Sequence, residues 1–400
     1  MVKKILVLIS LYLLTSIFIL SKPLEEIVKS NNKMAVKLLT LIEEKNGGEN
    51  IFISPFSINS AISITLLGAK GETKEEMLKA LEISENEANY HKDFSKIINE
   101  VEKSSTKETI FKNGNRLWVE KDFHLLKKFV DKVNEFYKGG ISSVDFKNNL
   151  KSAIEEINNW VMEKTANNIK DLLRESDLDN STRLVITNAV YFKGTWEKEF
   201  KEENTLSDIF HLESGEEKDI KMMFNKGHYL YGENEKWQIL GMKYRGNNFI
   251  MFIILPKKGK KVMDISKEIA KNGLSNSINS LSHENVEVYI PKFKFEKRYY
   301  LKNYLMKMGI KKAFSSNADF SGITGKKDLF IDKVIHQAKI EVNEKGSEAA
   351  AATAISMKLT SAAPIFNEKR IIFKADHPFI FFIIHKNTGE IIFEGVFNKP

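Results

Sequence analysis

The chain has 400 residues, of which 42% are hydrophobic, enough for one large or two medium-sized domains with a sizeable core. Its formal net charge of +8 is spread along the chain without a dense basic run, and no nucleic-acid recognition motif is present, so nucleic-acid binding is not expected. The absence of cysteine excludes disulfides and thiolate metal sites.

The first 21 residues have the pattern of a secretory signal peptide. Lys3 and Lys4 precede an apolar stretch over residues 5–20, which is short for a membrane-spanning helix and is followed by the polar residues Ser21 and Lys22. Cleavage after Ser21 would leave residues 22–400 as the mature chain. The pattern favours a secreted protein, extracellular or periplasmic, over one that keeps the segment as a membrane anchor.

Helical patterns dominate the first half of the chain. Apolar periodicity predicts helices over residues 24–43, 59–67, 73–81 and 153–169. The third of these begins with Thr73 and Glu76, which have the spacing of a capping box, the reciprocal side-chain cap of a helix N-terminus.

Strand patterns follow in the second half, over residues 184–192, 248–255, 286–295, 331–342, 371–374, 379–385 and 390–397. The last two flank Asn387, Thr388 and Gly389, a sequence typical of a hairpin turn. Helices first and strands later, with no internal repeat or linker, predict a single domain of the α+β class.

Residues 344–360 carry the most distinctive pattern, EKGSEAAAATAISMKLT. Alternate residues from Ser347 to Leu359 run from small to apolar, and those from Glu348 to Thr360 run from small to polar, as in a half-buried strand. The alanine run has little strand propensity, however, and Gly346 gives the segment a flexible start. We interpret the segment as an exposed loop that can enter a β-sheet; the alternative is an alanine-rich helix.

No known catalytic or cofactor-binding motif is present. The sequence lacks G-x-S-x-G, H-E-x-x-H and glycine-rich phosphate-binding patterns, and its eight histidines have no metal-ligand spacing. We therefore expect no metal site, no organic cofactor and no enzymatic activity, although a triad assembled from distant residues would leave no such pattern.

A series of short motifs resembles one protein family, the serpins, over residues 28–400. The motifs are ISPFSI at 53–58, GNRLW at 114–118, NNWV at 158–161, NAVYFKGTW at 188–196, IPKF at 290–293, MGI at 308–310, ADFSG at 318–322 and DHPF at 376–379. Each motif alone is weak, but their order and spacing together are specific. The segment EKGSEAAAAT at 344–353 resembles the hinge of inhibitory members.

The resemblance implies a fold of three β-sheets and about nine helices, with a reactive-centre loop at about residues 344–364 exposed above the central sheet. It also implies a mechanism, in which a target protease attacks the loop as a substrate and forms an acyl-enzyme. The cleaved loop then inserts into the sheet as a new strand and traps the protease. The expected protein is a monomer whose partner is a protease in a covalent complex.

The resemblance also assigns roles to individual residues. The hinge that leads the insertion would comprise Glu344, Gly346, Ser347, Glu348, Ala349, Ala350, Ala351, Ala352 and Thr353. A polar cluster beneath the opening strands, the shutter, would comprise Ser54, Ser57, Asn188 and His336. The site where the loop first enters, the breach, would comprise Trp196, Lys292 and Glu344, with an ion pair between the last two. Without the resemblance, a lone histidine such as His336 on an apolar strand would be read as a core residue.

The resemblance also implies a position for the reactive bond, because the family's spacing from Glu344 would put it between Thr360 and Ser361. Threonine there favours a protease of elastase-like or subtilisin-like specificity. A shift of one residue would put Leu359 at the bond and favour a chymotrypsin-like protease, and a shift of two would put Lys358 there and favour a trypsin-like one.

A secreted hydrolase would rest only on scattered Ser, His and Asp residues, and two other interpretations stay within the same family. A non-inhibitory member, acting as a carrier or chaperone, would not need a hinge of small residues, whereas residues 349–352 are all alanine. An inhibitor of cysteine proteases is a variant of the same mechanism, because the trap acts on any acyl-enzyme. Polyanion binding would need a basic helix face, and the candidates lie among acidic residues and are interpreted as a solvated surface: Lys92, Lys96, Lys103 and Lys107.

Overall fold

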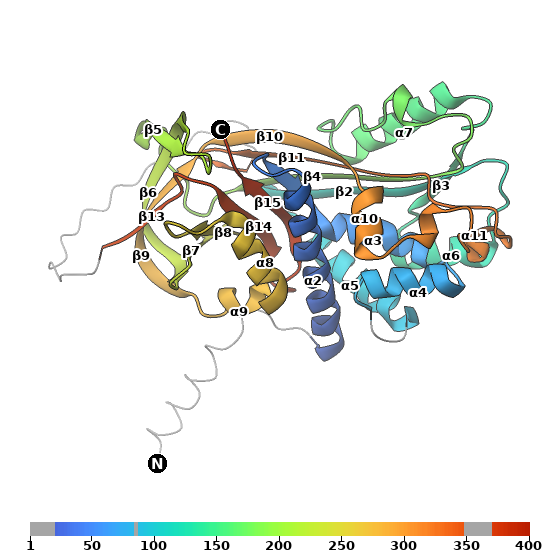
Figure 1. Ribbon diagram of the computed structural model, residues 1–400, viewed down its shortest axis with the longest axis horizontal. Helices are drawn as coiled ribbons and strands as arrows, with labels where there is room; N and C mark the ends of the chain where they lie inside the picture. Colours follow the sequence, from blue (N-terminus) through green and yellow to red (C-terminus); the bar gives the residue numbers. More distant parts are fainter. Residues whose placement is uncertain (1–20, 84–86, 348–369) are drawn as a thin grey trace, which may run out of the picture.

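The computed structural model describes residues 21–83, 87–347 and 370–400. Within them, two β-sheets pack together, with α7 on one side of the central sheet and α3 to α6 on the other (Figure 1). The α-helices of the described chain are α2 (Lys22–Lys45), α3 (Pro55–Leu66), α4 (Gly71–Ala80), α5 (Glu87–Lys103), α6 (Lys127–Tyr137), α7 (Leu150–Lys164), α8 (Val262–Asn272), α9 (Leu274–Ile278), α10 (Lys302–Met308) and α11 (Ser321–Thr324).

The central sheet has six strands in the order β10-β11-β12-β4-β2-β3. They are β2 (Thr109–Glu120), β3 (Ile141–Val144), β4 (Leu184–Thr195), β10 (Phe293–Tyr300), β11 (Lys333–Val342) and β12 (Gly346–Ser347). Strand β11 runs antiparallel to β10 and parallel to β4. The two-residue strand β12 lies between β11 and β4 at one end of the sheet.

The second sheet has the order β1-β15-β14-β8-β7-β6-β9-β13, with β5 added beside β6. Its strands are β1 (Ile51–Ile53), β5 (Thr205–His211), β6 (Glu217–Glu233), β7 (Trp237–Lys243), β8 (Phe249–Pro256), β9 (Ser282–Pro291), β13 (Ile371–Lys374), β14 (Phe379–His385) and β15 (Ile391–Phe397). The long strand β6 pairs with β5 at its start, with β9 in its middle and with β7 at its end. The three expected sheets correspond to the central sheet and to two parts of the second sheet that meet at β6. One part contains β1, β15, β14, β8 and β7, and the other contains β9 and β13.

Aromatic side chains fill the space between the two sheets. The ring centroid of Phe393 in β15 lies 6.2 Å from that of Phe111 in β2 and 5.7 Å from that of Phe192 in β4. Phe393 also stacks on Phe52 of β1 at 5.1 Å. Such ring pairs contribute roughly 0.5–1.5 kcal/mol each beyond their burial. The inner face of the central sheet is thus held against the second sheet.

Most elements predicted from the sequence are confirmed. The predicted helices correspond to α2, α3, α4 and α7, and six of the predicted strands correspond to β4, β8, β11, β13, β14 and β15. The strand predicted over 286–295 is wrong as a single element, because β9 ends at Pro291 and β10 begins at Phe293 in a different sheet. Lys292 between them donates its backbone N–H to the carbonyl oxygen of Lys221.

The capping box predicted at Thr73 and Glu76 is wrong. Helix α4 begins before Thr73 and has no side-chain cap at its N-terminus. Thr73 Oγ1 instead accepts a hydrogen bond from the backbone N–H of Asp319, and Glu76 accepts from the backbone N–H groups of Lys311 and Lys312. The two side chains therefore satisfy backbone donors of a distant segment that would otherwise lack partners.

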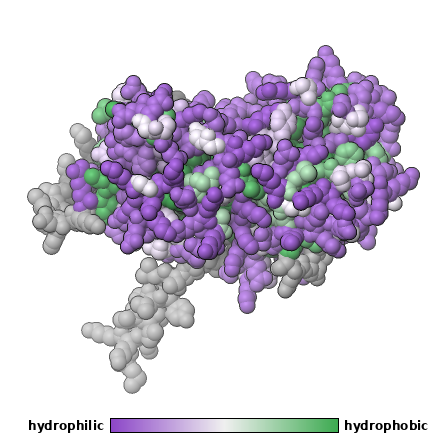
Figure 2. Space-filling view, viewed as in Figure 1, coloured by the Kyte–Doolittle hydropathy of each residue, from purple (hydrophilic) through white to green (hydrophobic). Residues whose placement is uncertain are grey.

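The surface offers no sign of a membrane span or metal site within the described ranges. None of the helices described is long and apolar enough to cross a bilayer, and no group of three or more potential metal ligands occurs among the same residues. The face seen in Figure 2 is mostly hydrophilic. On α5, Lys96 pairs with Asp93 at 2.6 Å, as expected for a surface of mixed charge.

Candidate functional site

Strand β12 occupies one end of the interface between β4 and β11. Gly346 and Ser347 pair with Thr195 and Gly194 of β4, and Ser347 also pairs with Val342 of β11, in both cases antiparallel. Beyond β12, the strands β11 and β4 pair directly with each other in parallel, over residues 333–338 and 185–190. The chain thus reaches residue 347 between two neighbouring strands that separate to hold it.

Close packing explains why glycine occupies one position on each of the neighbouring strands β12 and β4 at this point. A Cβ atom on Gly346 would lie 1.9 Å from the carbonyl oxygen of Gly194, and a Cβ atom on Gly194 would lie 2.5 Å from the ring of Tyr244. From the sequence, we expected Gly346 to supply flexibility. Its close approach to the backbone of β4 is an additional reason for glycine there.

Ser347 defines which face of β12 points inward. Its side chain is fully buried, and its Oγ lies 2.6 Å from the hydroxyl oxygen of Tyr244. Because side chains alternate along a strand, a strand that continued β12 would turn every second residue after Ser347 to the same side. In such a strand, the residues up to Leu359 that run from small to apolar would share the inward face with Ser347. Tyr244 was not identified from the sequence.

Glu344 is anchored by two polar groups at the breach. It is 6% exposed, its Oε2 lies 2.9 Å from Nζ of Lys292, and its Oε1 accepts a hydrogen bond from Oγ1 of Thr205 at 2.8 Å. Burial alone would raise the pKa of Glu344, but the hydrogen bonds from Lys292 and Thr205 outweigh burial and lower it. The predicted ion pair is confirmed, and no pattern in the sequence indicated Thr205.

Trp196 holds the residues on both sides of Glu344. Its backbone N–H donates to the carbonyl oxygen of Lys345 at 2.8 Å, and its indole Nε1–H donates to that of Asn343 at 3.0 Å. The indole also stacks on the ring of Tyr244 at 4.4 Å. The three predicted breach residues therefore meet around the start of the hinge.

His336 is fully buried and bonded through both ring nitrogens. Its Nδ1 contacts Oδ1 of Asn188, and its Nε2 accepts the backbone N–H of Ser54 at 3.1 Å. These partners assign the ring proton to Nδ1, because an amide oxygen accepts and a backbone N–H donates. Burial lowers the pKa of His336 to about 3, so the ring is neutral. His336 and Asn188 are partners in the parallel pairing of β11 with β4, so a strand inserted there must break their contact.

Ser57 completes the network at the shutter. Its Oγ lies 2.7 Å from the Oδ1 atoms of both Asn113 and Asn115 on β2, and it accepts a hydrogen bond from Nδ2 of Asn188 at 2.6 Å. Its backbone N–H donates to Oγ of Ser54, the N-cap of α3, at 3.3 Å. All four predicted shutter residues are thus connected. Asn113 and Asn115 were missed. Their spacing of two residues would have placed them on the same face of a strand.

Two groups of predicted site residues lie outside the described ranges. They are the later hinge residues and the candidates for the reactive bond: Glu348, Ala349, Ala350, Ala351, Ala352, Thr353, Lys358, Leu359, Thr360 and Ser361.

Comparison with known proteins matches both the sequence motifs and the geometry. A family model described as serpin (serine protease inhibitor) matches residues 29–400. An uncharacterized serpin-like protein of Thermococcus kodakarensis is 40% identical over 358 residues, which cover 90% of this chain and 82% of the relative. The leukocyte elastase inhibitor of Bos taurus is 38% identical over 385 residues, covering 94% and 100%.

Among solved structures, human thyroxine-binding globulin in complex with thyroxine is similar with a TM-score of 0.85. It is 27% identical in sequence, and the match covers 94% of this chain and 99% of that one. The motif order, the two sheets with β12 between β4 and β11, and the match over residues 29–400 agree with one another. The chain belongs to the serpin family.

Proposed function

We propose that this chain is a secreted inhibitor that traps target proteases by inserting its cleaved reactive loop into the central sheet. The observation that carries the proposal is the position of β12, which already lies between β4 and β11 in the direction that an inserting loop would follow. The alanines at residues 349–352 support it, because small side chains pass between neighbouring strands with little steric cost.

Insertion would replace one kind of strand pairing by another. In the native sheet, β11 and β4 pair in parallel over residues 333–338 and 185–190. A strand between them would form antiparallel ladders on both sides, and parallel pairing is slightly less stable per residue. The inward residues Ile355, Met357 and Leu359 would also become buried, each contributing about 1.5–3 kcal/mol. These gains would drive the insertion once cleavage frees the loop.

The register of β12 predicts where the inserted loop meets the shutter. Ser347 pairs with Gly194, so six residues further along two antiparallel strands would bring Thr353 beside Asn188. The same count from the pairing of Ser347 on β11 would bring Thr353 beside His336. The threonine hydroxyl would then lie where the contact between Asn188 and His336 had been broken.

The proposed target is a serine protease of elastase-like, subtilisin-like or chymotrypsin-like specificity. A reactive bond between Thr360 and Ser361 would suit a protease with a small specificity pocket, and Leu359 at the bond would suit a chymotrypsin-like one. The similarity to leukocyte elastase inhibitors supports this choice. Secretion is proposed from the signal pattern over residues 1–21.

A carrier function is the second candidate. It is favoured by the likeness to thyroxine-binding globulin, whose solved structure contains thyroxine. The alanine-rich hinge and the position of β12 favour the inhibitor, because a carrier needs neither.

Denaturing gel electrophoresis of the purified protein mixed with pancreatic elastase, chymotrypsin, trypsin or subtilisin tests the proposal. We expect a band at the summed mass that survives denaturation, and mass spectrometry of the released C-terminal peptide then identifies the reactive bond. Cleavage by every protease without a covalent complex, and without a gain in heat stability, would favour the carrier instead.

A further inference from the structure

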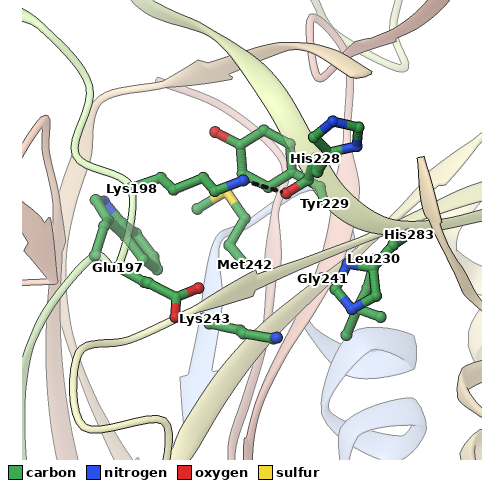
Figure 3. A pocket seen from close by; sticks show the side chains of 10 residues that line it. Glu197, Lys198, His228, Tyr229, Leu230, Gly241, Met242, Lys243 and His283 are labelled. Atoms are coloured by element: carbon green, nitrogen blue, oxygen red, sulfur yellow. Dashed lines mark hydrogen bonds between the residues drawn. The ribbon is translucent and has the colours of Figure 1, made fainter. Parts of the chain in front are cut away.

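A surface pocket of about 120 Å³ lies beside Trp196, where β6, β7 and β9 come together (Figure 3). Trp196, Leu230 and Met242 give it apolar surface. None of its lining residues belongs to the hinge or the shutter, and only Trp196 has a role in the breach. The pocket therefore adjoins the described start of the hinge only through Trp196.

Positive charge predominates among the polar side chains of this pocket. Figure 3 shows Lys198 and the ring of His228 above the cavity, and Glu197, Lys243 and His283 below it. Lys198 Nζ donates to the carbonyl oxygen of His228 at 2.5 Å, which leaves its other N–H groups available. Burial, followed by the charges of Lys243, Lys198 and His228, lowers the pKa of His283. An anion in the pocket would relieve the repulsion among these groups.

Tyr229 adds a polar group that has no hydrogen-bond partner among the described residues. It lines the pocket and is only 6% exposed, yet its hydroxyl is unpaired. Burial raises the pKa of Tyr229 to about 12, so the hydroxyl keeps its proton and can donate. A buried hydroxyl without a partner is unfavourable, but its oxygen is closed to solvent, so a ligand in the pocket would not contact it in this arrangement.

Trp196 connects the pocket to the hinge. Trp196 borders the cavity but is only 1% exposed; its indole Nε1–H donates to the carbonyl oxygen of Asn343, and its backbone N–H donates to that of Lys345. A ligand that packs against this indole would favour the native position of the hinge.

We propose that this pocket binds a small organic carboxylate, with its charged end among Lys198, Lys243 and His283 and its apolar part against Trp196 and Met242. A ligand that binds the native form alone stabilises that form by mass action, so occupancy raises the stability of the native state. Binding itself does not depend on the inhibitor proposal, so failure of either can be recognised separately.

Isothermal titration calorimetry with benzoate tests the site, with benzyl alcohol as an uncharged ligand of similar shape. We expect benzoate to bind saturably at one site per chain. Lys243→Met should bind it about tenfold more weakly, because a positive charge that attracts the carboxylate is lost. The matched variant Lys258→Met, at an exposed turn outside the pocket, should bind like the wild type.

The affinity for benzoate should also increase between pH 8 and pH 5.5 in the wild type, because protonated His283 adds a positive charge to the pocket. The increase should be smaller in His283→Asn.

Thermal unfolding provides the second measurement. Benzoate should raise the melting temperature of the wild type and of Lys258→Met, and raise it less for Lys243→Met. Absence of saturable binding, equal affinity for benzyl alcohol, or equal affinity and equal stabilisation in Lys243→Met would overturn the proposal. His283→Asn serves as an independent variant if Lys243→Met does not fold.

Discussion

Two lysine–glutamate pairs near the breach differ mainly in burial. Lys292 pairs with Glu344 at 2.9 Å, and Lys294 pairs with Glu341 at 2.7 Å. The side chain of Glu344 is 8% exposed, whereas that of Glu341 is 27% exposed. Exposed pairs contribute at most about 1 kcal/mol, but removal of one partner from a buried pair costs about 3–5 kcal/mol. The first pair should therefore decide how firmly the hinge is held.

Replacement of Glu344 by lysine should release the hinge. Glu344→Lys places a positive charge beside Lys292 and removes the acceptor of Thr205. Because Lys292 is itself 40% exposed, we expect a loss of native stability below that of a fully buried pair, about 1–3 kcal/mol. Premature insertion or polymers should appear on warming. Native gel electrophoresis and thermal unfolding measure them. Glu341→Lys is the matched control, with an effect of about 1 kcal/mol or less. An unchanged melting curve without polymers in Glu344→Lys would contradict the prediction.

His336 should make the native state sensitive to acid. Its pKa is lowered from 6.5 to about 3 in the folded chain, so its contribution is fully present above pH 6.5 and is lost as the pH falls toward 3. The loss approaches about 1.4 kcal/mol per pH unit within that window. Urea unfolding at pH 7, 5.5 and 4.5 should show a flatter pH dependence for His336→Gln than for the wild type. The exposed His124, changed to glutamine, should leave the profile unaltered, and a similar profile in all three proteins would argue against the role of His336.

Glu394 in β15 should destabilise the native state at neutral and alkaline pH. It is fully buried, and neither carboxylate oxygen has a hydrogen-bond partner among the residues described. Burial raises its pKa well above 4.5, so its contribution is present at low pH and is lost as the pH rises through the folded pKa. Glu394→Leu should therefore raise the free energy of unfolding at pH 8 by about 1–4 kcal/mol in urea unfolding.

Glu390 is the matched position for this substitution. It is equally buried, but its Oε1 accepts a hydrogen bond from Nδ2 of Asn31 at 3.0 Å. Glu390→Leu would leave that amide without its acceptor and should destabilise the chain. If Glu394→Leu lowered stability at pH 8 as Glu390→Leu does, an unseen partner for Glu394 would have to exist.

Among the predicted elements, the alternation of side chains along strands was the most useful pattern for predicting structure. It predicted the two faces of the segment from Ser347 to Thr360, but not which face would point inward. That required the contact between Ser347 and Tyr244, because Tyr244 lies in a distant part of the chain. Thr205 and Asn113 were missed for the same reason, since their roles depend on partners that no local pattern reveals.

The failures among the predicted elements have similar causes. The strand predicted over 286–295 is continuous in its apolar pattern, but the chain passes from one sheet to the other at Lys292. The spacing of Thr73 and Glu76 fits a helix cap, but tertiary contacts with residues 311–319 use both side chains. Motif order was sufficient for the family, and it selected two groups of residues that the structure brings together, whereas no local pattern predicts the contacts between distant segments.

The inward and outward faces of an inserting loop should respond differently to charge. A strand that extended β12 would turn Ala351 inward with Ser347 and Ala352 outward, because side chains alternate along a strand. Ala351→Glu would bury a carboxylate between the sheets, so insertion should slow and the protein should behave mainly as a cleaved substrate. Ala352→Glu should keep most of the inhibition. The ratio of covalent complex to cleaved chain on a denaturing gel measures the difference, and equal ratios for the two variants would refute the inferred orientation.

For the whole molecule, the native state holds a central sheet in which β11 and β4 pair directly below β12. The shutter contact between His336 and Asn188 crosses this pairing. Under the proposed mechanism, this arrangement persists only while the intact loop cannot follow β12 between the strands. Cleavage would remove that restriction, because it would create a free chain end.

Cleavage of the loop should therefore raise the stability of the whole molecule. Burial of Ile355, Met357 and Leu359 alone would contribute roughly 5–9 kcal/mol. For a chain of this size, the melting temperature should then rise by at least about 6–11 °C, and new antiparallel ladders would add to this. Calorimetry of the intact and cleaved forms measures the shift, and cleaved Ala351→Glu should show a smaller one. An equal melting temperature before and after cleavage would mean that the loop stays outside the sheet, so β12 would be a fixed edge contact and not the first part of an inserting strand.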